Sequence, residues 1–179
     1  MATVPNEDTI AVGTKIAASW GNSDVRDAIN FLLNPPNVHV TNTTGLSHTT
    51  GVSLLLTWDT EIADTDTMHS TVTTTSRLVA TTGGLYTVTA RAAFAANATG
   101  IRSLDVRKNA AGVAAGGTRV GYDSQTPVTG AVTSVAVVED IRMAAGDYLE
   151  AFGYQTSGGA LALDATAGFT LFQLRWVAL

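Results

Sequence analysis

Residues 84–94 read Gly-Leu-Tyr-Thr-Val-Thr-Ala-Arg-Ala-Ala-Phe, and two kinds of side chain alternate along them. Apolar side chains occupy every second position from Tyr86 to Phe94, with threonines and Arg91 among the residues between them. This period of two predicts a long β-strand with one face in a hydrophobic core. The pair Gly83-Gly84 supplies a turn at which such a strand can begin.

The chain around this stretch repeats the same alternation between turns rich in glycine, asparagine and aspartate. The expected strands are 38–41, 52–58, 77–80, 84–94, 101–108, 118–122, 131–143, 148–154 and 169–177. We expect a polar loop at Asp59–Thr75, between the second and third of these strands. Eight to ten short strands at this spacing predict a sandwich or a barrel. Residues 37–179 therefore form one all-β domain in this prediction.

The first 36 residues have a different pattern and are predicted to form an N-terminal arm. Residues 1–20 are polar with scattered apolar anchors, Trp20 among them. A short helix is expected at about 23–33, where Asn22 or Ser23 could cap it and Pro35-Pro36 would end it. Its apolar stripe contains Val25, Ile29 and Leu32. A helix this short does not fold alone, so the stripe must dock on the β-domain, on another copy or on a larger assembly.

Composition limits the classes of partner. Of the 179 residues, 45% are hydrophobic and only 14% are charged, which predicts that part of the surface is buried against other subunits. The net charge of -5 argues against nucleic-acid binding. Without cysteine there can be no disulfide and no thiolate zinc site. No apolar run approaches the roughly 20 residues that span a bilayer, so no membrane span is expected.

Acidic residues are concentrated between positions 59 and 69, in the predicted polar loop. Asp64 and Asp66 could offer carboxylate oxygens to a structural calcium ion. The alternative is a solvated acidic loop, which we favour because the glycine and the distal glutamate of an EF-hand are absent. We therefore expect no metal and no other cofactor.

Candidate catalytic groups are sparse. The carboxylates on or beside strands, which a sugar-cleaving enzyme could use in pairs, are Asp105, Glu139, Asp140 and Glu150. The simpler interpretation is that they pair with Arg102, Arg107 and Arg142. No serine lies in a Gly-x-Ser-x-Gly turn. The sequence therefore predicts a protein that is not an enzyme.

Aromatic side chains offer a different function, carbohydrate binding. Trp58, Tyr148 and Tyr154 lie in alternating strands, where aromatic residues are usually part of the core. Tyr122 is flanked by Gly121 and Asp123 near a loop, and we expect it to be exposed. Because binding residues concentrate on loops, Tyr122 and Asp123 are the candidate ligand-binding loop.

Four features, taken in order over residues 50–179, resemble the C1q/TNF-like jelly roll. These are Gly84-Leu85-Tyr86 at the start of a long strand, Lys108-Asn109 after the next, Ala145-Gly146-Asp147-Tyr148, and an aromatic last strand from Phe169. The resemblance implies a tight homotrimer. It also implies that the apolar faces shared between core and trimer interface are those around Tyr86, Tyr154, Phe172 and Trp176.

The segment from Ala17 to Pro36 is similar to the openings of tail or appendage proteins of phages and prophages of Gram-positive bacteria. This resemblance implies a virion protein, a homotrimeric tail-fibre tip or minor tail protein that contacts the host surface. The arm would bind other virion proteins, and the head would bind host cell-surface carbohydrate. The alternative is a capsid decoration or head-fibre trimer, and a carbohydrate-active enzyme is the third hypothesis.

Overall fold

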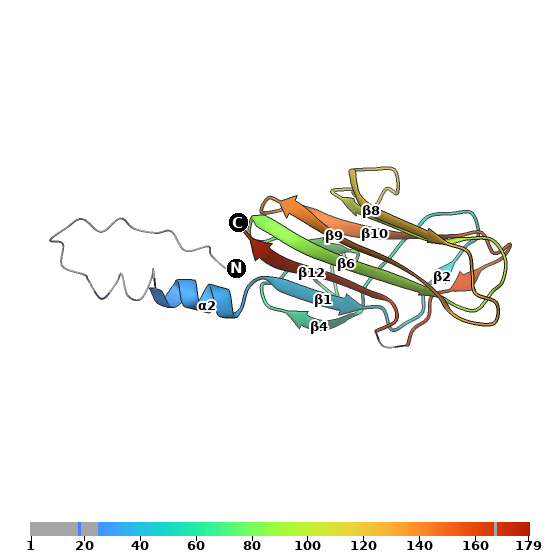
Figure 1. Cartoon of the computed structure of the whole chain (residues 1–179), viewed down its shortest axis with the longest axis horizontal. Coiled ribbons are helices and arrows are strands. Elements are labelled where there is room, and N and C mark those ends of the chain that lie inside the picture. Colours follow the sequence, from blue (N-terminus) through green and yellow to red (C-terminus); the bar gives the residue numbers. More distant parts are fainter. Residues whose placement is uncertain (1–17, 19–24, 167) are drawn as a thin grey trace.

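The computed structural model describes residues 18, 25–166 and 168–179, and these form a β-sandwich with one helix projecting from its end (Figure 1). Trp20, the extended part of the arm and the predicted capping residues Asn22 and Ser23 lie outside the described residues. The helix, α2, spans Asp27–Leu33. Its last residue is followed by Asn34 and by the expected Pro35-Pro36 step, after which the first strand begins.

The first layer, which we call the β6 sheet, has five antiparallel strands in the order β4-β1-β12-β6-β9. They span Thr60–Asp64 (β4), Asn37–Thr41 (β1), Leu171–Ala178 (β12), Gly84–Phe94 (β6) and Thr133–Met143 (β9). The long strand predicted from the alternation is β6, with the predicted bounds. It pairs with β9 along its whole length and with β12 on its other side.

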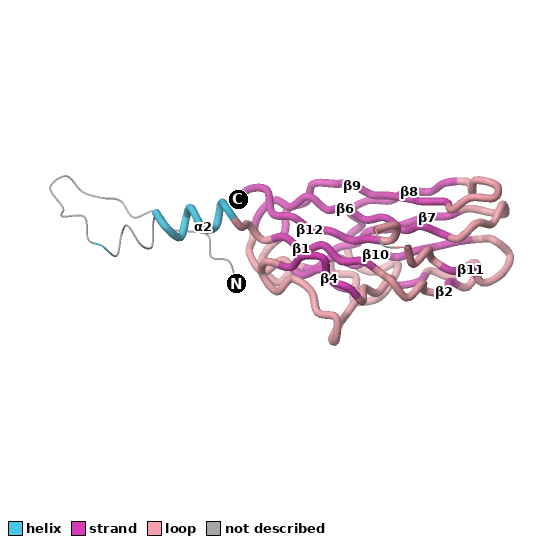
Figure 2. The backbone as a smooth tube through the Cα atoms, turned by 90° about the horizontal axis from the view of Figure 1, so that it is seen from below, coloured by secondary structure: helices cyan, strands magenta, loops and turns pink. Residues whose placement is uncertain are grey.

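The second layer, the β7 sheet, has the order β3-β10-β7-β8, and β5 also pairs with β10. Its strands span Leu54–Leu55 (β3), Tyr148–Gln155 (β10), Arg102–Lys108 (β7), Thr118–Gln125 (β8) and Arg77–Val79 (β5). A separate two-stranded sheet joins β2 (Ser47–His48) to β11 (Leu161–Ala162). Figure 2 shows the strands running along the long axis of the molecule.

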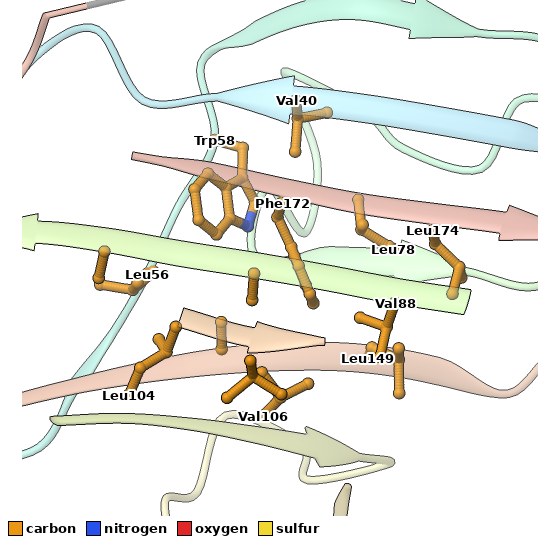
Figure 3. Close-up of a cluster of buried hydrophobic side chains, with 14 of the residues drawn as sticks. Val40, Leu56, Trp58, Leu78, Val88, Leu104, Val106, Leu149, Phe172 and Leu174 are labelled. Carbon is orange, nitrogen blue, oxygen red and sulfur yellow. The ribbon is translucent and has the colours of Figure 1, made fainter. Parts of the chain in front are cut away.

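The core fills the space between the two sheets (Figure 3). From β6 it receives the alternating apolar side chains predicted from the sequence, and Tyr86, Val88 and Ala90 are completely buried. Trp58 packs on Phe172 with ring centroids 5.4 Å apart. Burying a large apolar side chain contributes roughly 1.5–3 kcal/mol to stability. This layer of side chains therefore supplies most of the free energy that stabilises the packing of one sheet on the other.

The antiparallel registers place two sets of loops at opposite ends of the sandwich. The end that carries α2 also holds the C-terminus and the turns 80–84 and 144–147, because Gly84 pairs with Met143 beside the end of β12. The opposite end holds the connections 95–101, 126–132 and 156–160 (Figure 1). The molecule therefore has a helical end and a loop end.

Two sequence predictions were wrong in detail. Within the predicted strand 52–58 only Leu54 and Leu55 form β3. The amide of Leu56 donates to the carbonyl of Ala151, and the amide of Trp58 donates to the carbonyl of Thr75 instead of continuing the strand. The predicted loop Asp59–Thr75 begins as β4, which extends the β6 sheet by pairing with β1. The short strands β2 and β11 were not predicted, since two residues carry no alternation.

Tyr86 gives a test of this core. Its buried hydroxyl donates a hydrogen bond to the carbonyl of Thr82 at 2.6 Å, and burial raises its pKa to about 12. The unfolded chain releases this proton near pH 10, whereas the folded chain holds it until about pH 12. The stabilisation is therefore complete below pH 10 and is lost as the pH rises toward 12. We expect urea unfolding to show this fall in the free energy of unfolding.

The variant Tyr86→Phe should lose about 1 kcal/mol at pH 7 with the hydrogen bond and should show a smaller fall between pH 10 and pH 12. Tyr122→Phe, at a half-exposed tyrosine, is the matched control and should keep the full pH dependence. An equal loss of stability by the Tyr86→Phe variant and the unmodified protein over that range would contradict this account of Tyr86.

Candidate functional site

Concave surfaces lie on the outer faces of both sheets, on opposite sides of the core. The first is a cleft of about 520 Å³ between α2 and the β6 sheet. The second is a cleft of about 380 Å³ on the β7 sheet. The strand alternation that sends apolar side chains inward also sends the lining residues of both clefts outward.

The base of α2 is fixed to the first cleft by one aromatic contact. Phe31 packs edge-on against Trp176, with ring centroids 4.8 Å apart. The indole nitrogen of Trp176 donates to the carbonyl of Gly83 at 3.3 Å. The backbone amide of Trp176 donates to the carbonyl of Pro36. Phe31, which the predicted stripe did not include, is thus the docking residue of the helix.

The predicted stripe is largely exposed: Val25 precedes α2, Ile29 lies on it, and Leu32 lines the first cleft. Val25, Ile29 and Leu32 are 40%, 50% and 71% exposed in the single chain. The neighbouring Leu33 is exposed as well. The β-domain therefore does not cover this stripe.

The outer face of the β6 sheet carries mostly uncharged side chains around the first cleft, with Arg175 in its lining and Asp140 bonded to Thr87. Thr87 and Thr89 on β6 lie beside Gln173 and Arg175 on β12, and Val177 completes the lining at the end of β12. Val177 and Val138, the β9 residue opposite Thr89, are half-exposed or more. Short polar and apolar side chains make up most of the lining of this face.

The four aromatic residues expected at the core and the trimer interface occupy different places. Tyr86 and Phe172 are completely buried between the sheets. Trp176 is partly buried and closes the helical end of the core. Tyr154 lies on the outer face of the β7 sheet, among the lining residues of the second cleft.

The second cleft is built from rows of side chains that cross the β7 sheet. Tyr122 on β8 lies opposite Asp105 on β7, which lies opposite Phe152 on β10. In the next row, Ser103 lies opposite Tyr154. Ala114 and Ala115 from the connection between β7 and β8 also line the cleft.

Two arginines share one carboxylate at the centre of this cleft. Arg119 donates to both oxygens of Asp105, at 3.0 Å and 2.8 Å, and the Nε of Arg107 donates to the same carboxylate at 2.9 Å. The hydrogen bonds to Asp105 raise the pKa of Arg119. The Arg119 guanidinium also lies 4.9 Å from the centre of the Tyr122 ring, within the range of a cation–π contact. The three charges leave the cleft with a surplus of one positive charge.

The predicted ligand-binding loop is a strand. Tyr122 and Asp123 both belong to β8, which continues to Gln125 because it pairs with β7 throughout. Their side chains therefore point to opposite faces. Tyr122 is 50% exposed in the second cleft, whereas Asp123 accepts the amide proton of Ala136 on β9 at 3.0 Å.

The candidate calcium residues stabilise their own loop. The Asp64 carboxylate accepts the amide protons of Asp66, Met68 and His69 at 2.9–3.1 Å. Asp66 is buried and accepts a hydrogen bond from Thr81. Among the described residues, no group of three or more histidine or acidic side chains is placed to hold a metal ion. Asp64 therefore acts as the cap of a tight turn.

Three of the four carboxylates weighed for sugar hydrolysis, Asp105, Asp140 and Glu150, bind partners in separate places, and Glu139 is exposed. Glu150 is buried and accepts hydrogen bonds from Arg77 and from the amide of Gly112. Asp140 on β9 accepts one from Thr87 on the adjacent strand β6. The predicted pairing of Arg107 with a carboxylate is confirmed.

The prediction for Arg102 was wrong. This residue is buried, and its guanidinium donates to the carbonyls of Asn97, Thr99 and Ile101. It thereby holds the loop between β6 and β7. A sequence gives no signal that separates this use of an arginine from a carboxylate pair.

The two sheets, with their strand order, define a TNF-like jelly roll, as the sequence resemblance implied. The Eiger TNF structure from S. frugiperda matches with 15% identity and a TM-score of 0.59, over 80% of this chain and 94% of that one. Murine APRIL at pH 8.0 matches with 10% identity and a TM-score of 0.61, over 79% and 98%. The structure of murine APRIL at pH 5.0 matches with a TM-score of 0.59 and the same identity and coverage. At this level of identity the likeness establishes the fold alone.

No protein-family model matches the sequence, and the search of curated proteins gives no match. Among the described residues, no helix has the length and apolar character needed to cross a bilayer.

The capping role of Asp64 can be tested. Because Asp64→Ala leaves three amide groups without their acceptor, we expect it to lower the free energy of unfolding by about 2 kcal/mol. Glu139→Ala, at an exposed carboxylate of β9, is the control and should change stability by less than about 0.5 kcal/mol. Calcium should leave the melting temperature of the unmodified protein unchanged, and a rise on addition of calcium would contradict this role.

Proposed function

We propose that this chain is a phage virion protein that assembles as a homotrimer and acts as a tail-fibre tip or minor tail protein at the host surface. The observation that supports this function best is the separation of the two ends. An apolar helix with uncovered side chains projects from one end, and loops lie at the other (Figure 1). Such a layout suits an anchor on the particle and a head that faces outward.

Trimer formation is proposed to use the outer face of the β6 sheet. This face combines threonines, Gln173 and Val177 with Arg175, and Asp140 on β9 bonds to Thr87 beside them. Arg175 and Asp140 carry opposite charges, so a second copy would cover a face without surplus charge around the cleft. The occupant we propose is a second copy of the chain. The low overall charge of 14% supports this choice, because it indicates a surface that is partly covered by protein.

The helical arm is proposed to bind other virion proteins. Val25, two residues before α2, and Ile29 on α2 are both exposed. A helix with apolar side chains in i and i+4 positions fits a hydrophobic groove of a partner. The similarity of residues 17–36 to phage appendage proteins supports a partner on the particle.

A capsid decoration or head-fibre trimer is the second candidate. One observation favours it: only residues 34–36 separate α2 from β1, so the head is held close to its anchor. A protein attached to a shell needs no longer spacer. In both candidates the chain acts by binding and not by catalysis.

The trimer face can be disrupted by charge. Thr89 and Gln173 lie opposite each other on the outer face of the β6 sheet. The double variant Thr89→Arg with Gln173→Arg should leave the single chain folded and should weaken the trimer at least 100-fold, because the interface would bury uncompensated charges. Sedimentation over a dilution series measures this effect. Thr118→Arg with Ser124→Arg, on exposed positions of β8, is the control, and equal weakening by both pairs would contradict the proposed interface.

The arm can be tested on particles. The double variant Val25→Asp with Ile29→Asp should remain a trimer but enter particles at least tenfold less, measured by immunogold labelling of purified virions. The pair Val25→Leu with Ile29→Leu keeps the stripe apolar and should enter normally. Gold at the tail end would support host attachment, and gold over the head would favour capsid decoration. Normal entry of the aspartate variant would refute the role of the arm.

A further inference from the structure

We propose that the cleft on the outer face of the β7 sheet binds an anionic sugar. This inference rests on the proposed function, since it names the site and the chemical class of the surface carbohydrate that such a protein would contact. The site differs from the loop end of the sandwich, where binding residues would ordinarily be sought. It also lies on the sheet opposite the proposed trimer face, so the assembly would leave it open.

The cleft has the size and the mixed lining of a small-molecule site. Its volume of about 380 Å³ falls within the roughly 300–1,000 Å³ typical of such sites, and suits one or two sugar rings. Tyr122 offers a half-exposed aromatic ring, against which the C–H face of a sugar can stack. Arg119 lies against the same ring and restricts its orientation, which lowers the entropy lost on binding.

Polar groups in the cleft remain available for a ligand. Within the described part of the chain, the hydroxyls of Ser53, Ser103 and Tyr154 make no hydrogen bond to protein. Hydroxyls can donate and accept, and they therefore match the hydroxyls of a sugar. Ser103 is largely buried, so Ser53 and Tyr154 offer the more accessible hydroxyls, and in the same cleft as the Tyr122 ring they can orient a ring-shaped polar ligand.

The charge of the cleft indicates an anionic ligand. Arg119 uses Nε and Nη2 for Asp105, and Arg107 uses Nε for Asp105 and Nη1 for the carbonyl of Gly116. Within the described residues, Nη1 of Arg119 and Nη2 of Arg107 have no protein acceptor. One carboxylate thus neutralises only one of two guanidinium groups, in a chain whose net charge is -5. A carboxylate or phosphate on the sugar would complete this arrangement.

The test uses the full chain and a matched pair of probes: a tetrasaccharide that contains hexuronic acid and its carboxyl-reduced, neutral counterpart. We expect the acidic probe to bind with a millimolar or lower Kd by NMR titration, at least fivefold more tightly than the neutral one. Raising the salt concentration should reduce this difference. Equal affinity for both probes, or no binding of either, would overturn the proposal.

Variants locate the site. Tyr122→Ala should weaken binding of the acidic probe at least tenfold, and Tyr122→Phe should retain it because the ring remains. Arg119→Gln should remove the preference for the acidic probe, and Arg119→Lys should keep part of it. Lys108→Gln removes the same charge from β7 outside the cleft lining and should change nothing. A loss of preference in Lys108→Gln equal to that in Arg119→Gln would overturn the proposed site.

Failure of this inference is distinguishable from failure of the proposed function. The cleft lies on the sheet opposite the proposed trimer face, so the proposal expects a single chain to bind as well. A trimer that enters particles but binds neither probe refutes only the sugar site. A monomer that binds the acidic probe through Tyr122 refutes the trimer and leaves the site intact.

Discussion

The pairing of β6 with its two neighbours is the constraint on which the rest of the molecule depends. Its eleven residues pair with β9 along the full strand and with β12 on the other side. A shift by one residue would turn the alternating core side chains of β6, from Tyr86 to Phe94, to solvent, so the hydrophobic alternation fixes both registers. These registers place Trp176 where Phe31 can dock α2, and they turn Thr89 and Gln173 outward together.

Long strands could be predicted because their alternation is local, whereas features that depend on distant partners could not. The exposure of Tyr122 was predicted correctly, but its place in β8 depends on pairing with β7, which a single strand does not reveal. The ion pair between Arg119 and Asp105 joins residues that are 14 positions apart in the sequence. Nothing in the sequence distinguishes it from the other arginine–carboxylate pairs that were weighed. Phe31 was missed because it lies outside the predicted helical stripe.

The two faces of the sandwich suit two different tasks. The β6 sheet presents short polar and apolar side chains with few charges, beside a helix whose stripe is uncovered. The β7 sheet presents a charged and aromatic cleft. Because the core separates the two faces, assembly on one sheet need not alter binding on the other. This division would let a virion protein hold three binding clefts outward from a single anchored base.

The most direct measurement is the native mass of the unmodified full chain at micromolar concentration. The account predicts a trimer with three times the 18.5 kDa mass of one chain. This trimer should persist on dilution. A single species of 18.5 kDa over the same range would contradict it. The charge-poor sheet face and the exposed helical stripe would then need another explanation.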